Sequence, residues 1–173
     1  MKRIVVLMLL FNFSFLINKS QAQITKAVVG IDGLTCSQCS KSVEQQMKKR
    51  SFVNNLYMAL AETELTLTFK EGAVIDWKQI AQAVVDAGFS VRSITVSIPS
   101  HFLQESEQQI NANGSRFYFL NSLSKKNLAD TTVKFQIIGK AFLPRREYRN
   151  YLTKYPNLKN SMGGYACIWL KNK

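Results

Sequence analysis

Between residues 24 and 98, the spacing of hydrophobic residues changes in an order that few folds accommodate. Strand-like segments are 24–31, 53–60, 65–69 and 89–98, and helix-like segments are 38–50 and 77–87. A period of two indicates strands, and apolar residues three and four apart indicate helices. The resulting order, βαββαβ, gives in its split form a four-stranded antiparallel sheet with both helices on one face.

Single residues support the ends of the second helix and of the last strand. Asp76 is a favourable N-cap residue, and Gly88 is suited to the position just past a helix C-terminus. The predicted apolar face of this helix comprises Trp77, Ile80, Ala81, Val84 and Val85. Pro99 ends the last strand, because proline cannot donate a ladder hydrogen bond.

Cys36 and Cys39 form a C-x-x-C pair where the first loop enters the first helix. This spacing can aim both sulfurs at one point. Cys39 falls in the first helical turn, where unpaired N–H groups and the helix dipole favour thiolate. Two convergent thiolates select soft ions such as Cu(I), and they also accept Hg(II), Zn(II) or Cd(II).

Four further residues are candidates for support of this loop: Gly33, Leu34, Thr35 and Phe89. Gly33 allows a sharp turn, and Leu34 can place an apolar side chain beneath the site. Phe89 follows the second helix at the same end of the sheet and could shield a metal ion from water. Ordinary packing is the alternative role for both Leu34 and Phe89.

The loop and the end of the second helix resemble the heavy-metal-associated domain family. The family's loop is Gly-Met-Thr-Cys-x-x-Cys, which Gly33, Thr35, Cys36 and Cys39 match, with Leu34 in place of Met. Asp86-Ala87-Gly88-Phe89 resembles the family's Asp-Ala-Gly-Tyr. The resemblance covers residues 24–98 and implies a ferredoxin-like fold with metal binding at Cys36 and Cys39. The family usually binds monovalent copper, and the resemblance also implies transfer of the ion to a partner.

Other roles for the cysteines stay open. The pair could be a structural disulfide or a thioredoxin-type redox pair, although the Trp and the Gly-Pro typical of the latter are absent. Structural zinc normally needs four ligands, and no second C-x-x-C or His pair supplies them. His101 is expected to be a solitary exposed histidine, and Cys167 a buried, inert thiol within a strand.

The N-terminus has the order of a secretory signal peptide. Met1-Lys2-Arg3 is basic, residues 4–17 are mostly apolar, and a polar stretch leads to small Ala22. We expect cleavage after Ala22 and export to the periplasm or the exterior. Fourteen helical residues would rise only about 21 Å, too little to cross a hydrocarbon core of ~30 Å.

Residues 99–173 are predicted as a linker, 99–115, followed by a small basic α+β domain, 116–173. Three strands are expected at 116–120, 132–143 and 165–170, with a polar loop at 122–130 and a turn at Asn113-Gly114. After Pro144, a helix is expected to carry Tyr148, Tyr151, Leu152 and Tyr155 on one face. With one histidine and few carboxylates, the sequence offers no catalytic set of a nucleophile, a base and a group that orients the base. We therefore expect no enzymatic activity.

The chain has a formal net charge of +12. Residues 23–98 carry eight basic and seven acidic side chains, whereas residues 99–173 carry twelve basic and four acidic ones. The charge therefore belongs to the C-terminal half, where Arg145, Arg146 and Arg149 cluster. In an exported protein this favours an anionic membrane surface, a metal-transporting membrane protein or another acidic partner over nucleic acid.

Overall fold

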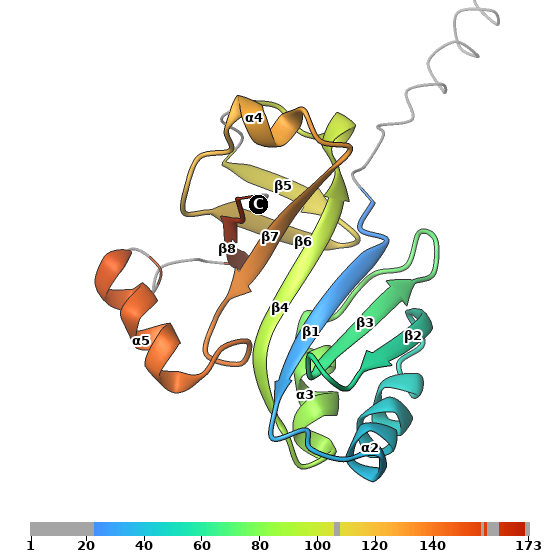
Figure 1. The fold of residues 1–173 in the computed structure, drawn as a ribbon. Helices are drawn as coiled ribbons and strands as arrows, with labels where there is room; N and C mark the ends of the chain where they lie inside the picture. The colour runs from blue at the N-terminus through green and yellow to red at the C-terminus, as the bar shows by residue number, and fades with distance from the viewer. Residues whose placement is uncertain (1–22, 106–107, 157, 159–162, 172–173) are drawn as a thin grey trace, which may run out of the picture.

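The computed structural model of the 173-residue chain describes residues 23–105, 108–156, 158 and 163–171 (Figure 1). The predicted signal peptide, residues 1–22, lies outside the described residues. Among the helices that the described residues form, none is both long enough and apolar enough to span a membrane.

The first half of the described chain has the predicted βαββαβ order. Its elements are β1 (Lys26–Asp32), α2 (Ser37–Lys48), β2 (Val53–Ala59), β3 (Glu64–Phe69), α3 (Trp77–Asp86) and β4 (Ser90–Pro99). The strands are ordered β2-β3-β1-β4, and every neighbouring pair is antiparallel. Helices α2 and α3 lie side by side against this sheet (Figure 1). This half therefore has a ferredoxin-like α+β fold.

The predicted ends of α3 are confirmed. Asp76 Oδ1 accepts hydrogen bonds from the backbone N–H groups of Lys78 (3.0 Å) and Gln79 (3.1 Å). Gly88 follows the helix with φ +91°, in the left-handed region that glycine adopts without strain. Val85 differs from the prediction, because 54% of it is exposed. The buried face of α3 is thus narrower than the apolar spacing indicates.

The second half contains more regular structure than predicted. Its elements are the 3₁₀ helix η2 (Ser100–Phe102), β5 (Gln109–Ala112), β6 (Ser115–Phe119), α4 (Lys125–Leu128), β7 (Thr132–Ile138), α5 (Arg145–Lys154) and β8 (Tyr165–Trp169). The predicted linker over 99–115 is wrong, because η2, β5 and the turn into β6 lie within it. In β5 only Ile110 and Ala112 are buried, and two apolar residues are too few to show a period of two.

Two boundaries in this half also differ from the prediction. The strand expected over 132–143 ends at Ile138, and a turn follows in which the Phe142 N–H donates to the Gly139 carbonyl (3.0 Å). The short helix α4 forms inside the segment 122–130, which was expected to be a polar loop. Helix α5 begins directly after Pro144, as predicted.

One sheet joins the two halves. Strand β4 pairs antiparallel with β7, which gives an eight-stranded sheet in the order β2-β3-β1-β4-β7-β8-β6-β5. Only the β6–β8 pair is parallel among these eight strands of the described residues. The predicted α+β domain at 116–173 therefore extends the first sheet instead of forming a sheet of its own.

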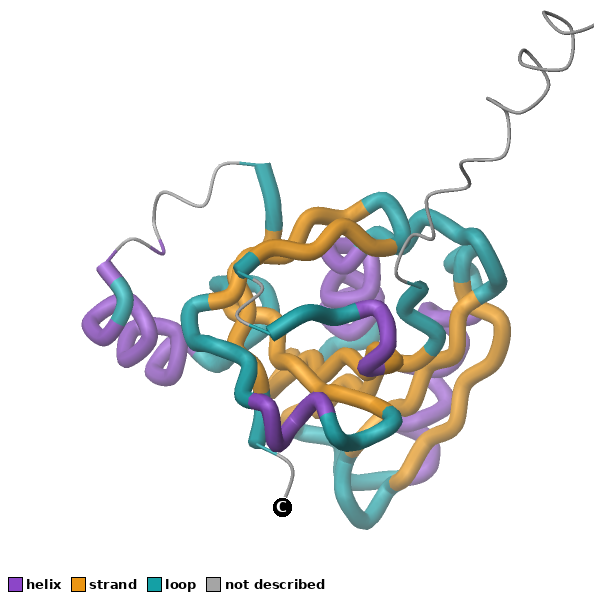
Figure 2. Tube along the Cα trace, turned by 90° about the horizontal axis from the view of Figure 1, so that it is seen from above, coloured by secondary structure: helices purple, strands orange, loops and turns teal. Residues whose placement is uncertain are grey.

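The far edge of the sheet curves back toward the first half. Asn113, in the β5–β6 turn, accepts a hydrogen bond from the Ile24 N–H (2.6 Å) and donates one to the Ala73 carbonyl (2.9 Å). Strands β5 and β2 occupy opposite edges of the sheet, yet this turn reaches residues adjacent to β1 and β3. Figure 2 shows the strands following this curvature instead of forming a flat layer.

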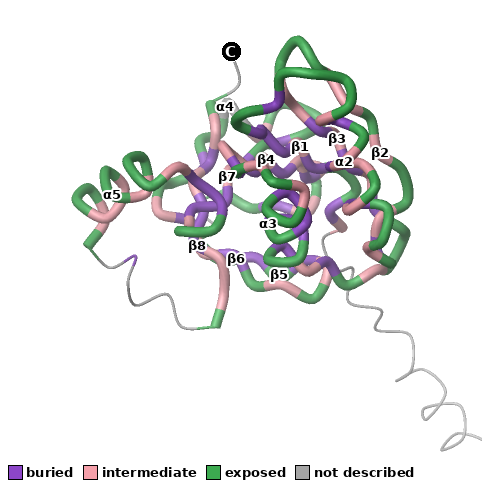
Figure 3. The backbone as a smooth tube through the Cα atoms, turned by 90° about the horizontal axis from the view of Figure 1, so that it is seen from below, coloured by how far each residue is buried: buried purple, intermediate pink, exposed green. Residues whose placement is uncertain are grey.

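Aromatic side chains fill the space that the curved sheet encloses. Ring centroids lie 5.8 Å apart for Phe69–Trp77, 6.0 Å for Trp77–Phe117 and 5.2 Å for Phe117–Phe135. These rings come from β3, α3, β6 and β7, and Trp77 is fully buried. The buried segments in the interior of Figure 3 thus form a continuous core across both halves.

Candidate metal centre

The loop between β1 and α2 turns sharply as soon as the strand ends. Gly33 has φ +86°, which favours glycine, and only 3% of Leu34 is exposed. The buried Leu34 anchors the loop to the core, as predicted. Thr35 and Cys36, which follow it, are exposed.

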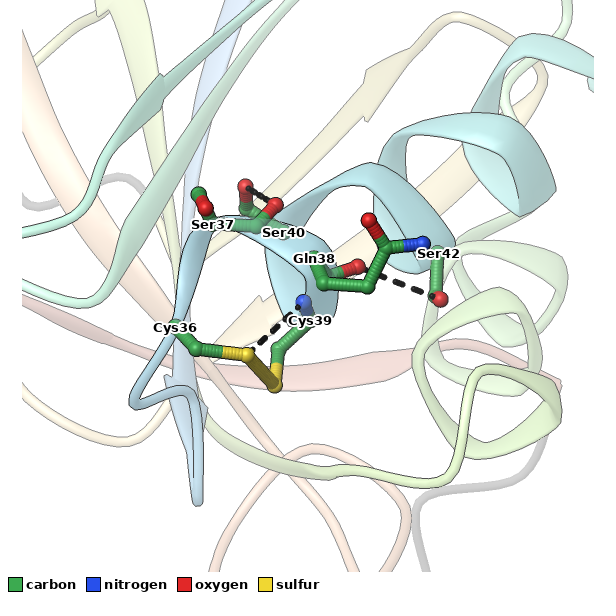
Figure 4. Close-up of a disulfide and its surroundings, with 6 residues drawn as sticks. All are labelled: Cys36, Ser37, Gln38, Cys39, Ser40 and Ser42. Carbon is green, nitrogen blue, oxygen red and sulfur yellow. Dashed lines mark hydrogen bonds between the residues drawn. A yellow bond between two sulfur atoms is a disulfide. The ribbon is translucent and has the colours of Figure 1, made fainter.

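Cys36 is the N-cap of α2. Its backbone is extended (φ −144°, ψ 159°), and its Sγ accepts a hydrogen bond from the Cys39 N–H at 3.2 Å (Figure 4). The Cys36 carbonyl accepts from the Ser40 N–H at 3.1 Å and begins the helical ladder. The cap therefore fixes the direction in which the Cys36 side chain leaves the backbone.

The two predicted ligands lie together at this helix end. A disulfide links Cys36 and Cys39, whose Cα atoms are 5.2 Å apart (Figure 4). Cys36 is exposed, and Cys39 is half-buried against the core. An oxidised pair cannot offer two thiolates, so metal binding at this position requires reduction of the bond.

Ser40 is a residue of this site that sequence reasoning missed. It is buried, and its hydroxyl donates to the Ser37 carbonyl (2.8 Å). The buried face of α2 consists of Ser40, Val43 and Met47, whereas the prediction placed Cys39 with Val43 and Met47. Ser40 precedes Val43 by three residues and Cys39 precedes it by four, and both spacings fit one helix face. The sequence prediction chose Cys39 because Ser40 is polar. Ser40 faces the core, and Cys39 lies at the edge of this buried helix face, where it is half-buried.

Phe89 lies beside the loop, as predicted. Its Cδ1 is 3.6 Å from the position that a Cβ on Gly33 would occupy. The ring is half-buried and packs against the main core. Phe89 therefore covers one side of the turn that leads to the cysteines.

The third cysteine is separate from this pair in the fold. Cys167 lies in β8 between β6 and β7, opposite Phe119 and Ile137. It is fully buried, and this burial raises the pKa of its thiol well above the usual value. Within the part of the chain that the structure describes, no group of three or more His, Cys, Asp or Glu residues could hold a metal ion. Cys36 and Cys39 are therefore the two cysteines that the fold brings together.

The segment that holds this loop matches a known family. Residues 28–90 match the family model described as the heavy-metal-associated domain. This segment is therefore a heavy-metal-associated domain. The match begins within β1 and ends at the first residue of β4, so it contains the cysteine loop and Phe89.

Relatives of this domain are found in larger proteins. The cation-transporting ATPase HMA5 of Oryza sativa subsp. japonica is 38% identical over 93 residues, which are 53% of this chain and 8% of that protein. The chain thus corresponds to less than a tenth of that relative's length. Similar solved structures include a copper-binding domain of the P-type ATPase HMA7 (29% identity, TM-score 0.36, covering 40% of this chain and 92% of that one). The yeast copper transporter domain Ccc2a is 21% identical, with a TM-score of 0.35 and coverage of 39% and 90%.

A groove lies beside the heavy-metal-associated domain, where the two halves meet. It has a volume of about 450 Å³ and is bounded by Asp32, Val85, Ser90, Val91, Lys140, Ala141, Leu143, Pro144 and Arg145. Asp32 directly precedes Gly33, and Ser90 directly follows Phe89. The fold therefore places the cations Lys140 and Arg145 at the same end of the sheet as the cysteine loop. Sequence reasoning gave no sign of this neighbourhood, which depends on the β4–β7 pairing.

Proposed function

We propose that the reduced heavy-metal-associated domain binds Cu(I) as cargo through the Cys36 and Cys39 thiolates. The observation that carries this proposal is that both sulfurs converge at the exposed N-terminus of α2. Two cellular thiol groups would supply two electrons and two protons to open the disulfide, and they would leave joined as a disulfide themselves. Cu(I) would then form two copper–sulfur bonds, and two protons would leave. Soft sulfur ligands favour Cu(I), and Hg(II), Zn(II) and Cd(II) are competing ions to compare.

Titration of the reduced mature protein with Cu(I), against a calibrated chromophoric chelator, tests this proposal. We expect one copper ion per protein. The Cys36→Ser/Cys39→Ser variant should bind copper more weakly by over about a hundredfold, because hydroxyl groups do not replace thiolates as ligands for a soft ion.

Cys167 provides the matched control for that titration. The Cys167→Ala variant also loses a thiol, but one that is buried and kept protonated by its raised pKa. Its copper affinity should equal that of the unmodified chain. Equal weak uptake by the unmodified chain and by the Cys36→Ser/Cys39→Ser variant would refute the proposal.

A thiol–disulfide or purely structural role is the second candidate, and the Cys36–Cys39 disulfide favours it. Exposure of Cys36 would allow exchange with an incoming thiolate. Rapid alkylation of the protein taken directly from its compartment distinguishes the two functions. A pair that reacts before any reductant is added supports metal binding in place, and a pair that stays oxidised supports the second candidate.

We further propose that the protein is exported, with cleavage after Ala22, and that it passes its metal to a metal-transporting membrane protein. The charged, apolar and polar order of residues 1–22 supports export. N-terminal sequencing of the protein recovered from its native compartment should start at Gln23. An N-terminus that retains residues 1–22 would contradict cleavage.

A further inference from the structure

Helix α5 carries the densest group of exposed cations among the described residues. Arg145, Arg146, Arg149 and Lys154 are exposed, and Glu147 is the single acidic residue of the helix. At 3.6 residues per turn, Arg145, Arg146 and Arg149 lie within about 100° of one another around α5 and form a basic face. We propose that this basic face docks the protein on an anionic lipid surface.

The opposite side of α5 attaches the helix to the body of the protein. Tyr148, Tyr151, Leu152 and Tyr155 pack against a small second cluster of buried residues that includes Ile138 and Leu143. No residue of α5 is fully buried, and the helix projects from the molecule (Figures 1 and 3). The basic face is therefore held in a fixed orientation while staying free of the core.

Arg145 and Arg146 do not stabilise helix α5 at the positions they occupy. Arg145 and Arg146 occupy its first turn, where the helix dipole disfavours positive charge, and Pro144 provides no side-chain cap. Among the ion pairs found between described residues, none involves Arg145, Arg146 or Arg149. These exposed arginines are therefore free of partners among the described residues and available to an external anion.

A lipid surface fits this chemistry better than an acidic protein. The positive charge is large, since residues 99–173 carry twelve basic side chains against four acidic ones. Basic helices of this kind are typical of the interface between lipid and water, where long arginine side chains reach the headgroups.

The fold connects this surface with the cysteine loop. Arg145 and Lys140 border the groove whose other side is formed by Asp32 and Ser90, adjacent to Gly33 and Phe89. Arg145, at the start of α5, therefore lies at the same end of the sheet as the cysteine loop. Lipid docking through α5 does not depend on the proposed metal-binding function.

Cosedimentation with vesicles tests the docking. The probe is a mixed vesicle of phosphatidylcholine and phosphatidylglycerol, compared with vesicles of phosphatidylcholine alone. The Arg145→Gln/Arg146→Gln/Arg149→Gln variant should partition roughly a hundredfold more weakly, because each cation near an anionic surface contributes about a fivefold factor. Binding of the unmodified chain should fall as salt is raised.

A variant with the same net charge controls for long-range attraction. Lys41→Gln/Lys70→Gln/Lys78→Gln removes three exposed cations from the first half and should bind nearly as well as the unmodified chain. The Cys36→Ser/Cys39→Ser variant should bind the mixed vesicles as strongly as the unmodified chain. Failure of lipid docking can therefore be distinguished from failure of copper binding. Equal losses in the two glutamine variants would overturn the proposal. Binding to polyglutamate without binding to the mixed vesicles would also overturn it and would indicate an acidic protein partner.

Discussion

Replacing Trp77 with alanine is expected to lower the free energy of unfolding by about 3–5 kcal/mol. Trp77 is fully buried at the start of α3, with Phe69 of β3 on one side and Phe117 of β6 on the other. Removing the indole would leave a cavity at the place where the cores of the two halves join. Because both halves lose a contact, we expect a single unfolding transition that shifts as a whole.

Urea denaturation followed by circular dichroism measures this effect. Val85→Ala on the same helix is the matched control, because the Val85 side chain is largely exposed and its loss should change the stability by less than about 0.5 kcal/mol. A Trp77→Ala variant that loses less than about 1 kcal/mol, or that unfolds in two steps, would show that the two halves have independent cores.

The features that the sequence predicts well are those that neighbouring residues determine. Asp76 and Gly88 act within one turn of α3, and their roles as cap and terminator are confirmed. The Asn113-Gly114 turn is also local: φ is +48° and +75°, which suits a tight hairpin between β5 and β6. Each of these signals depends on backbone conformation over two to four residues.

The convergence of Cys36 and Cys39 belongs to the same class. Their spacing across a helix start places the two side chains together whatever the rest of the chain does. Phe89 beside Gly33 is a longer-range contact, but the order βαββαβ already places both at one end of the sheet. The position of the cysteine loop could therefore be predicted from the C-x-x-C spacing and from the βαββαβ order of the elements around it.

The joining of the two halves was not predictable in the same way. Pairing of β4 with β7 connects residues 33 to 41 positions apart, and no local sequence signal selects β7 over another strand. Trp77 and Phe117 are also far apart in the sequence, and neither aromatic residue by itself indicates which ring it contacts. Pro99 suggested a domain boundary, yet it is the last residue of β4 and is paired with Thr132. A proline at the end of a strand indicates where the strand ends and does not show what pairs with it.

Asn113→Ala is expected to lower the free energy of unfolding by about 3 kcal/mol, because it removes two hydrogen bonds and strains the turn. The Asn113 side chain accepts from the Ile24 N–H and donates to the Ala73 carbonyl, and both bonds are partly buried. Alanine would leave these backbone groups without the side-chain partner. It would also adopt the left-handed conformation less readily than asparagine, which has φ +48° here.

Two further substitutions divide this loss between its causes. Asn113→Gly removes the same hydrogen bonds but tolerates a positive φ, so it should retain about 1 kcal/mol more stability than Asn113→Ala. Asn111→Ala, at an exposed position of β5 in the same hairpin, is the control and should have little effect. Equal stability of the Asn113→Ala and Asn111→Ala variants would mean that the hairpin stays docked without the Asn113 bonds. The aromatic contacts around Phe117 would then be sufficient to hold the second half of the sheet against the first.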